Sequence, residues 1–154
     1  MEIVLKPIGI VRSPYRTRAE APRQGWLRPE VVSEILVFEP YAPALKDVEG
    51  FSHLIILYYC HEARPWQPLI TTPWDTRPHG LFATRSPDRP NPIALCVVEL
   101  LKRVGNTLVV RGLDAVDGSP VLDVKPYIPS LDAFPEADIG WLKGRLPLKP
   151  RADG

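Results

Sequence analysis

Two polar segments of the chain combine residue types that could carry chemistry. The first, residues 83–92, has the sequence ATRSPDRPNP, in which prolines alternate with Arg85, Arg89 and Asn91. Proline restricts φ and so lowers the entropy lost when a loop is ordered. Guanidinium and amide groups offer directed donors for a phosphate, a carboxylate or a base edge. A second interpretation stays open, a proline-rich crossover whose arginines bond to backbone carbonyls.

The second segment, residues 113–127, has the sequence LDAVDGSPVLDVKPY, with three carboxylates, a lysine and a phenol. Asp123 and Lys125 are two apart on a predicted strand and therefore share a face of it. Such a pair is often a surface ion pair that contributes under ~1 kcal/mol. Pro126 ends the pairing beside it, so the pattern also fits a binding site at a strand end.

Several common sites are excluded by spacing. No two glycines are separated by a single residue, which removes the dinucleotide-binding G-x-G-x-x-G motif, and the phosphate-binding G-x-x-x-x-G-K-S/T motif is absent too. The cysteines lack C-x-x-C spacing, so we expect neither a disulfide nor a metal site. The histidines and cysteines that match no ligand pattern are His53, His61, His79, Cys60 and Cys96.

The elements that must position these segments are mainly strands. Proline accounts for 19 of 154 residues, more than twice the usual ~5%, and each proline interrupts a helix. β-Branched and aromatic runs bounded by turn residues predict six strands, and Gly105-Asn106 predicts a hairpin. We expect 51–59 to be a central strand buried on both faces. The predicted strands are 3–11, 31–38, 51–59, 93–101, 107–111 and 121–125.

Strands without crossover helices between them must be antiparallel, which predicts an all-β fold, a small antiparallel β-barrel with long irregular loops and short helical turns. The long loops are 13–29 and 62–92, and helical turns are expected at 41–48 and 138–143. The length fits a single domain, residues 1–146, followed by a flexible C-terminal tail, residues 147–154. No apolar run approaches the ~18 residues of a membrane span, so we expect a cytoplasmic protein without a membrane partner.

The charge is nearly balanced, at +1 overall, which excludes a strong field over the whole molecule. Any nucleic-acid contact must therefore be local. A modest basic patch lies between residues 12 and 28, where Glu20 is the one acid, although an exposed loop kept soluble by arginine would look the same. Its arginines are Arg12, Arg16, Arg18, Arg23 and Arg28.

The two polar segments also carry a resemblance. Residues 80–93 (GLFATRSPDRPNPI) and 114–129 (DAVDGSPVLDVKPYIP) closely resemble the signature of the TsaA-like (TrmO) family of S-adenosylmethionine-dependent tRNA methyltransferases. Supporting matches lie at 9–15, 22–24 and 51–61, so the resemblance covers about 7–139. The sequence departs from the usual family pattern by small replacements at Ala94, Cys96 and Ser119, which put local packing in doubt rather than the reaction.

The resemblance implies a small β-barrel, a homodimer with sites near the subunit interface, and S-adenosyl-L-methionine as cofactor. The implied reaction is methylation of N6 of N6-threonylcarbamoyladenosine next to the tRNA anticodon, so the anticodon stem-loop would be the partner. A cationic sulfonium favours nearby carboxylate or carbonyl oxygens. The implied cofactor contacts are Arg23, Gln24, His61, Arg85, Leu95, Cys96, Leu113, Asp114 and Asp117.

Methyl transfer depends mainly on holding nucleophile and methyl group in line, and an acceptor for the released proton should help. By analogy with other adenine-N6 methyltransferases we expect Asn91 and Pro92 to supply this acceptor, with Asp117 and Tyr127 as second choices. Expected RNA contacts are Arg12, Arg89 and Lys125. Fold does not establish reaction. A cofactor sensor, a dimeric scaffold without transferase activity, and a methyltransferase acting on another substrate therefore stay open.

Overall fold

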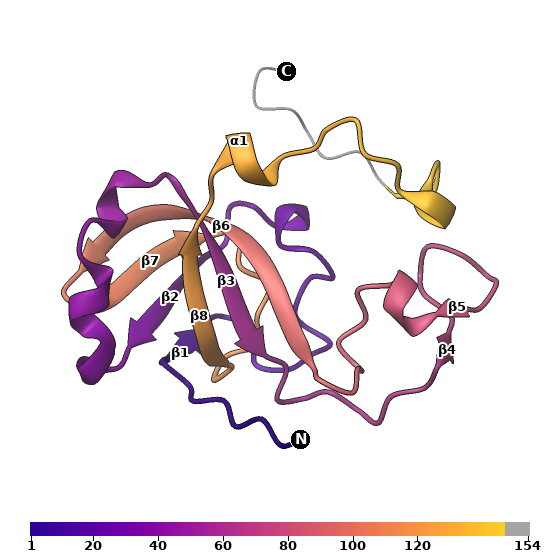
Figure 1. Ribbon diagram of the computed structural model, residues 1–154, viewed down its shortest axis with the longest axis horizontal. Coiled ribbons are helices and arrows are strands. Elements are labelled where there is room, and N and C mark those ends of the chain that lie inside the picture. Colours follow the sequence, from indigo (N-terminus) through magenta and orange to yellow (C-terminus); the bar gives the residue numbers. More distant parts are fainter. Residues whose placement is uncertain (147–154) are drawn as a thin grey trace.

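The computed structural model describes residues 1–146 and confirms the predicted all-β, antiparallel architecture (Figure 1). Six strands close into a barrel in the order β1-β2-β7-β6-β3-β8. The predicted flexible tail, 147–154, lies outside the described residues. The barrel strands are β1 (Gly9–Arg12), β2 (Val32–Val37), β3 (His53–Tyr59), β6 (Ile93–Val104), β7 (Thr107–Arg111) and β8 (Pro120–Pro126).

Short elements occupy the connections. The helical turns predicted at 41–48 and 138–143 correspond to 3-10 turns, and a single α-helical turn after β8 was not predicted. Within residues 1–146 no helix has the length and apolar character to cross a bilayer. The short elements are β4 (Leu69–Ile70), β5 (His79–Gly80), α1 (Pro129–Asp132), η1 (Gly25–Leu27), η2 (Glu39–Leu45), η3 (Val48–Gly50), η4 (Leu81–Ala83) and η5 (Gly140–Leu142).

The barrel encloses one apolar core, formed by alternate residues of each strand. On β3, Leu54, Ile56 and Tyr58 are buried while the residues between them are partly exposed. The prediction that 51–59 is buried on both faces is therefore wrong. The physical reason is that an antiparallel barrel has its core on one side only, and nothing in the described part of the chain covers the outer face of β3 fully.

The first strand is shorter than predicted. Instead of 3–11, pairing begins at Gly9, and Ile3 is 75% exposed. Pro7 has no N–H to donate to a neighbouring strand, so the ladder cannot extend through it. At Gly9 a Cβ atom would lie 2.5 Å from the carbonyl oxygen of Leu36, so the close approach of β1 to β2 requires glycine here.

The long strand β6 changes partner halfway along its length. Residues 93–99 pair with β3, whereas 99–104 pair with β7, with an irregularity between Leu100 and Lys102. The hairpin predicted at Gly105-Asn106 is confirmed, with Gly105 at φ +62°. Gly112, at φ +86°, then turns the chain away from β6. Among the described residues no strand pairs with the second edge of 93–98, so this half of β6 is open to other segments.

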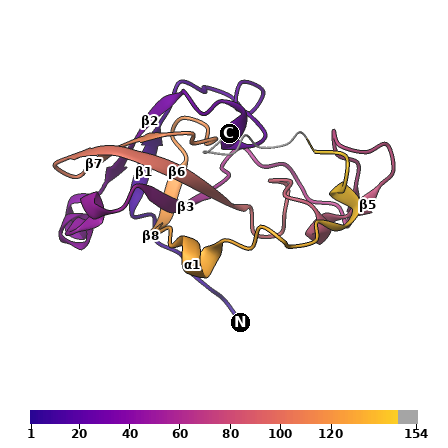
Figure 2. The same ribbon diagram turned by 90° about the horizontal axis from the view of Figure 1, so that it is seen from above.

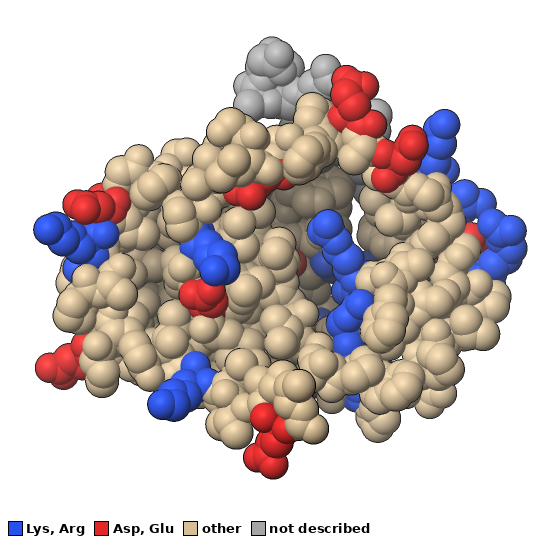
Figure 3. Space-filling view, viewed as in Figure 1, with Lys and Arg blue, Asp and Glu red and all other residues tan. Residues whose placement is uncertain are grey.

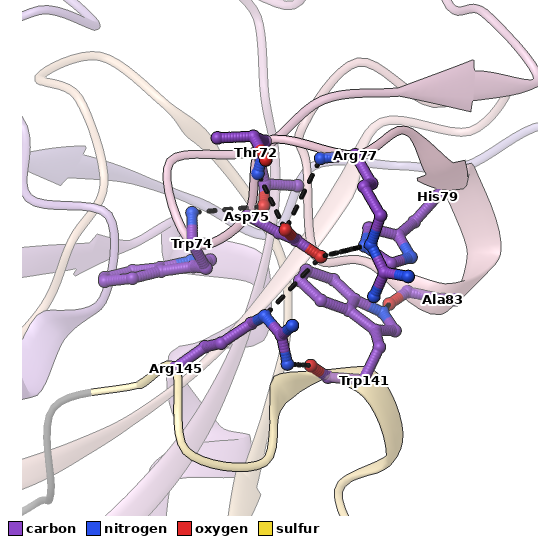
Figure 4. Close-up of polar contacts among 9 residues, drawn as sticks. Thr72, Trp74, Asp75, Arg77, His79, Ala83, Trp141 and Arg145 are labelled. Atoms are coloured by element: carbon purple, nitrogen blue, oxygen red, sulfur yellow. Dashed lines mark hydrogen bonds and ion pairs between the residues drawn. The ribbon is translucent and has the colours of Figure 1, made fainter.

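The arm, which we define as residues 69–83, stands off from the barrel, and η5 lies beside it in two views (Figures 1 and 2). Asp75, whose side chain is only 8% exposed, accepts from His79 Nε2 at 2.8 Å and pairs with Arg145 Nε at 3.5 Å. Trp141 stacks on His79 at 3.9 Å and donates from Nε1 to the Ala83 carbonyl at 2.8 Å (Figure 4). Residues from η5 and the turn after it therefore clasp the arm.

The clasp depends on an ionised Asp75. The hydrogen bond from His79 lowers the pKa of Asp75 to about 2, from a usual value near 3.8. The stabilisation is thus fully present above pH ~4 and is lost as the pH falls through about 2. We expect Asp75→Asn to accelerate amide hydrogen exchange in 69–83 and 140–145 while the barrel strands keep their protection. Asp138→Asn, at an exposed carboxylate, is the control. Unchanged exchange in the arm would contradict the clasp.

Candidate functional site

The candidate site lies where β6 and β7 separate. Cys96, on the open half of β6, places Sγ 3.3 Å from the carbonyl oxygen of Gly112. Gly25 of η1 packs on the same point: a Cβ built there would lie 1.8 Å from the Gly112 oxygen and 3.0 Å from Cys96 Sγ. No larger residue fits without displacing the backbone. The loop 13–29, the first half of β6 and the turn 112–117 therefore meet at this contact.

A half-buried carboxyl group, that of Asp114, lies at the centre of this junction. The Tyr58 hydroxyl donates to Asp114 Oδ1 at 2.6 Å. The Asp114 carboxyl also accepts from the backbone N–H of Gly25 and lies within hydrogen-bonding reach of Cys96. Burial raises the pKa of Asp114, and these hydrogen bonds oppose that rise. Burial and the neighbouring carboxylate raise the pKa of Tyr58, and burial raises that of Cys60 to about 11.

The start of loop 13–29 is fixed to the same turn. The backbone N–H of Ser13 donates to Asp117 Oδ1 at 3.0 Å, and the Ser13 hydroxyl donates to the Ala115 carbonyl at 2.8 Å. In return the Asp117 N–H donates to the Tyr15 carbonyl at 2.7 Å. Asp117 itself is exposed, so its carboxylate anchors the loop and also faces solvent at the site.

A charged pair that sequence reasoning did not identify joins the two long loops. Arg18 donates from NH1 and NH2 to the two oxygens of Asp88 at 2.6 and 3.0 Å. Asp88 also accepts from the Arg64 N–H at 2.8 Å, and Glu62 accepts from the Arg18 N–H at 2.7 Å. The Arg18 guanidinium lowers the pKa of Asp88. The sequence shows opposite charges in the two loops, but it does not show which residues pair across a separation of 70 positions.

Most of the expected cofactor contacts fall at this junction. Arg23 and Gln24 precede Gly25, and Cys96 lies directly beneath it. Leu113 is fully buried, whereas Leu95 is 54% exposed. His61 is exposed just before the 62–92 loop and Arg85 is exposed within it, and the Arg18–Asp88 pair ties this loop to the junction. The nine expected contacts, Arg23, Gln24, His61, Arg85, Leu95, Cys96, Leu113, Asp114 and Asp117, stay predictions as ligand contacts.

The expected proton acceptors are divided between the two ends of the barrel. Asn91 is exposed beside Pro92, whose carbonyl accepts from the Cys60 N–H at 2.8 Å, next to the junction. Tyr127 lies instead beside His53, with ring centroids 6.3 Å apart. Strand β3 separates the two places by six residue steps, about 20 Å at ~3.3 Å per residue. Within one chain, Tyr127 is not brought together with Asn91.

The expected RNA contacts have different local surroundings. Arg89 donates from Nη1 to the carbonyls of Leu81, Thr84 and Ser86 at 3.4, 2.9 and 3.2 Å. This matches the alternative interpretation of the loop, in which arginines bond to backbone carbonyls. Lys125 forms an exposed ion pair with Asp123 at 3.1 Å, toward the Tyr127 end. Arg12 is exposed at the end of β1, next to the Ser13 anchor. Contact of all three with RNA stays a prediction.

The surface near the junction is hollowed and carries positive charge. Figure 3 shows a hollow between the barrel and the arm, with Lys or Arg side chains along it. Within residues 1–146 no group of three or more His, Cys, Asp or Glu side chains is placed to hold a metal ion. The site therefore offers cations, exposed carboxylates and backbone groups as its donors and acceptors.

The steric contact at Gly25 gives a direct test of the junction. We expect Gly25→Ala to lower the free energy of unfolding by about 1–3 kcal/mol, because the added methyl group must displace the loop from Gly112. Trypsin cleavage after Arg23 should accelerate. Gly50→Ala is the matched control, since a Cβ at Gly50 has no atom within 4 Å. Equal stability and cleavage for both variants would show that the loop is not held this way.

Comparison with known proteins places this arrangement in a family. One Archaeoglobus fulgidus relative, described as a probable S-adenosyl-L-methionine-binding protein, is 48% identical over 96% of this chain and 40% of its own length. A second, described as an S-adenosyl-L-methionine-binding protein, is 46% identical over 94% of this chain and 100% of its own length. The Escherichia coli tRNA (adenine(37)-N6)-methyltransferase is 39% identical over 87% of this chain and 61% of its own length.

The solved structures agree. TrmO from Pseudomonas aeruginosa superposes with a TM-score of 0.80 at 34% identity, covering 96% of this chain and 65% of that one. The chain thus spans less than two thirds of this structure, of the Escherichia coli enzyme and of the first archaeal relative. Residues 10–133 match the family described as the tRNA-methyltransferase O N-terminal domain, and this chain belongs to that family.

Proposed function

We propose that this chain binds S-adenosyl-L-methionine at the opening between β6 and β7 and methylates N6 of an adenosine in tRNA. The observation that carries the proposal is the contact of Gly25 with Gly112 and Cys96, because it gathers the segments that resemble the cofactor-binding segments of the family. The specific substrate we propose is N6-threonylcarbamoyladenosine next to the anticodon. The name of the Escherichia coli relative supports an adenine-N6 target.

The groups at the junction suit this cofactor. A sulfonium carries positive charge and is stabilised by oxygen atoms, which the turn 112–117 supplies as backbone carbonyls and the exposed carboxylate of Asp117. The open edge of β6 at Leu95 presents backbone donors and acceptors that suit a nucleobase. Exposed Arg23 and Arg85 suit a carboxylate. When bound, the cofactor supplies an activated methyl group and leaves as a neutral thioether.

The chain's own contribution to transfer is position and proton acceptance. Holding the adenine nitrogen about 3–3.5 Å from the methyl carbon accounts for much of the rate enhancement. Asn91 and Asp117 lie at the junction end of the barrel, and we assign the proton acceptor to the Asn91 carboxamide with the adjacent Pro92 carbonyl. That carbonyl already accepts from Cys60 and retains a second lone pair. Tyr127, at the other end, is the weaker choice.

The exposed surface supports tRNA and a second subunit as partners. Arg12 and the positively charged side chains along the hollow suit the phosphates of an anticodon stem-loop (Figure 3). Ile93, Leu95 and Val97 expose 38, 54 and 39% of their surface on the outer face of β6. An apolar stripe beside a binding site is typical of an interface. We therefore propose a homodimer with its sites near the interface, acting on tRNA in the cytoplasm.

A second function is favoured by one comparison. The Archaeoglobus fulgidus relative that this chain matches over its whole length is described as binding S-adenosyl-L-methionine, with no reaction named. A sensor or a scaffold needs the same junction but no proton acceptor and no RNA contact. The two functions therefore differ in turnover and not in cofactor affinity.

Labelled methyl transfer separates these functions. We expect calorimetry to show stoichiometric binding of S-adenosyl-L-methionine, and label to enter threonylcarbamoylated tRNA but not the unmodified transcript. Asn91→Ala should keep the cofactor dissociation constant and lose at least about 10-fold in turnover, because general base assistance commonly contributes 10² or more. Binding without transfer to any tRNA would favour the sensor, and absence of binding would overturn the cofactor assignment.

A further inference from the structure

The pair formed by Tyr58 and Asp114 connects parts of the site that are far apart in sequence. Tyr58 points into the barrel from β3 and is 7% exposed. Its hydroxyl reaches Asp114 Oδ1 at 2.6 Å across a separation of 56 residues. A buried phenol with a charged acceptor is costly unless the hydrogen bond is kept. The pair is therefore a fixed point between β3 and the turn 112–117.

The same carboxyl group reaches two further elements. It accepts from the backbone N–H of Gly25 in η1 and interacts with the thiol of Cys96 on β6. One side chain thus joins β3, β6, the turn 112–117 and the loop that carries Arg23 and Gln24. Gly25 packs so closely on the Gly112 carbonyl that a methyl group at Gly25 does not fit without moving the backbone. The separation between loop and turn is set by this carboxyl.

Asp114 and Asp117 both lie in the turn but differ in solvent exposure and in hydrogen-bond partners. The Asp114 carboxyl is half-buried and accepts from the Tyr58 hydroxyl. Asp117 is exposed, and one of its carboxylate oxygens accepts from the Ser13 N–H. Asp117 is therefore the more accessible of the two carboxylates.

We propose that Tyr58 is a positioning residue of the cofactor site, which acts through Asp114 to hold the turn 112–117 against the Gly25 loop. The inference rests on the proposed cofactor. It assigns Tyr58 a role that neither the loop motifs nor the resemblance indicated.

Tyr58→Phe tests this role, because it removes the hydroxyl and keeps the ring in the core. We expect the dissociation constant for S-adenosyl-L-methionine to rise about 10-fold or more, with kcat at saturating cofactor within about threefold of wild type. In the cofactor-free protein, amide exchange at 25–27 should accelerate. Tyr41→Phe, the same change from phenol to phenyl within η2 and away from the junction, is the matched control and should alter neither quantity.

A double-variant cycle with Asp114→Asn tests whether Tyr58 acts through Asp114. If the two residues act as one unit, the double variant should bind no more weakly than the weaker single variant. Additive losses of affinity, or a Tyr58→Phe protein with wild-type affinity and wild-type exchange at 25–27, would overturn the inference. If wild-type protein fails to bind the cofactor, the proposed function fails, while the exchange measurement still decides whether Tyr58 holds the loop.

Discussion

The structure depends on the change of partner along β6. At Glu99 this strand leaves β3 and joins β7, and the Arg111 guanidinium holds Glu99 at 2.8 and 3.0 Å at that point. The first half of β6 is left with an edge that no described strand pairs. An uncovered edge exposes backbone donors and acceptors, so another segment must cover it. Gly112 and the Gly25 loop pack on this half of β6 at Cys96, and the candidate site lies beside that contact, where the edge stays open.

The long loops have little core of their own and are held by polar contacts. Arg18 with Asp88 ties the 13–29 loop to the 62–92 loop. The Asp75–Arg145 ion pair and the hydrogen bond from Trp141 to the Ala83 carbonyl tie the arm to η5 and the turn after it. Single exposed ion pairs contribute little, but each of these carboxylates also accepts backbone N–H donors. The prolines restrict the unfolded loops, so less conformational entropy is lost when the loops become ordered. Loop geometry at the site therefore follows from a few cross-loop contacts.

The alternation of apolar residues was sufficient to predict the barrel strands and the Gly105 hairpin, because both signals are local. The length of the first strand was overestimated. The apolar run at 3–5 suggested a strand, but Pro7 lacks the backbone N–H that pairing through this position would need. Tyr58 lies in an apolar run and looked like an ordinary core residue, and its partner Asp114 was expected only as a cofactor contact. Such roles arise from contacts between distant segments, which spacing along one sequence does not encode.

The most direct test of the account is nuclear magnetic resonance mapping of cofactor binding on labelled protein. Titration with S-adenosyl-L-methionine should shift the backbone amides of 23–27, 94–97 and 112–117, because these segments line the opening between β6 and β7. A second hollow, of about 420 Å³, lies on another part of the barrel between η2 and β8, lined in part by Tyr41, Phe51 and Val124. Shifts confined to that hollow, with the three segments unperturbed, would contradict the account.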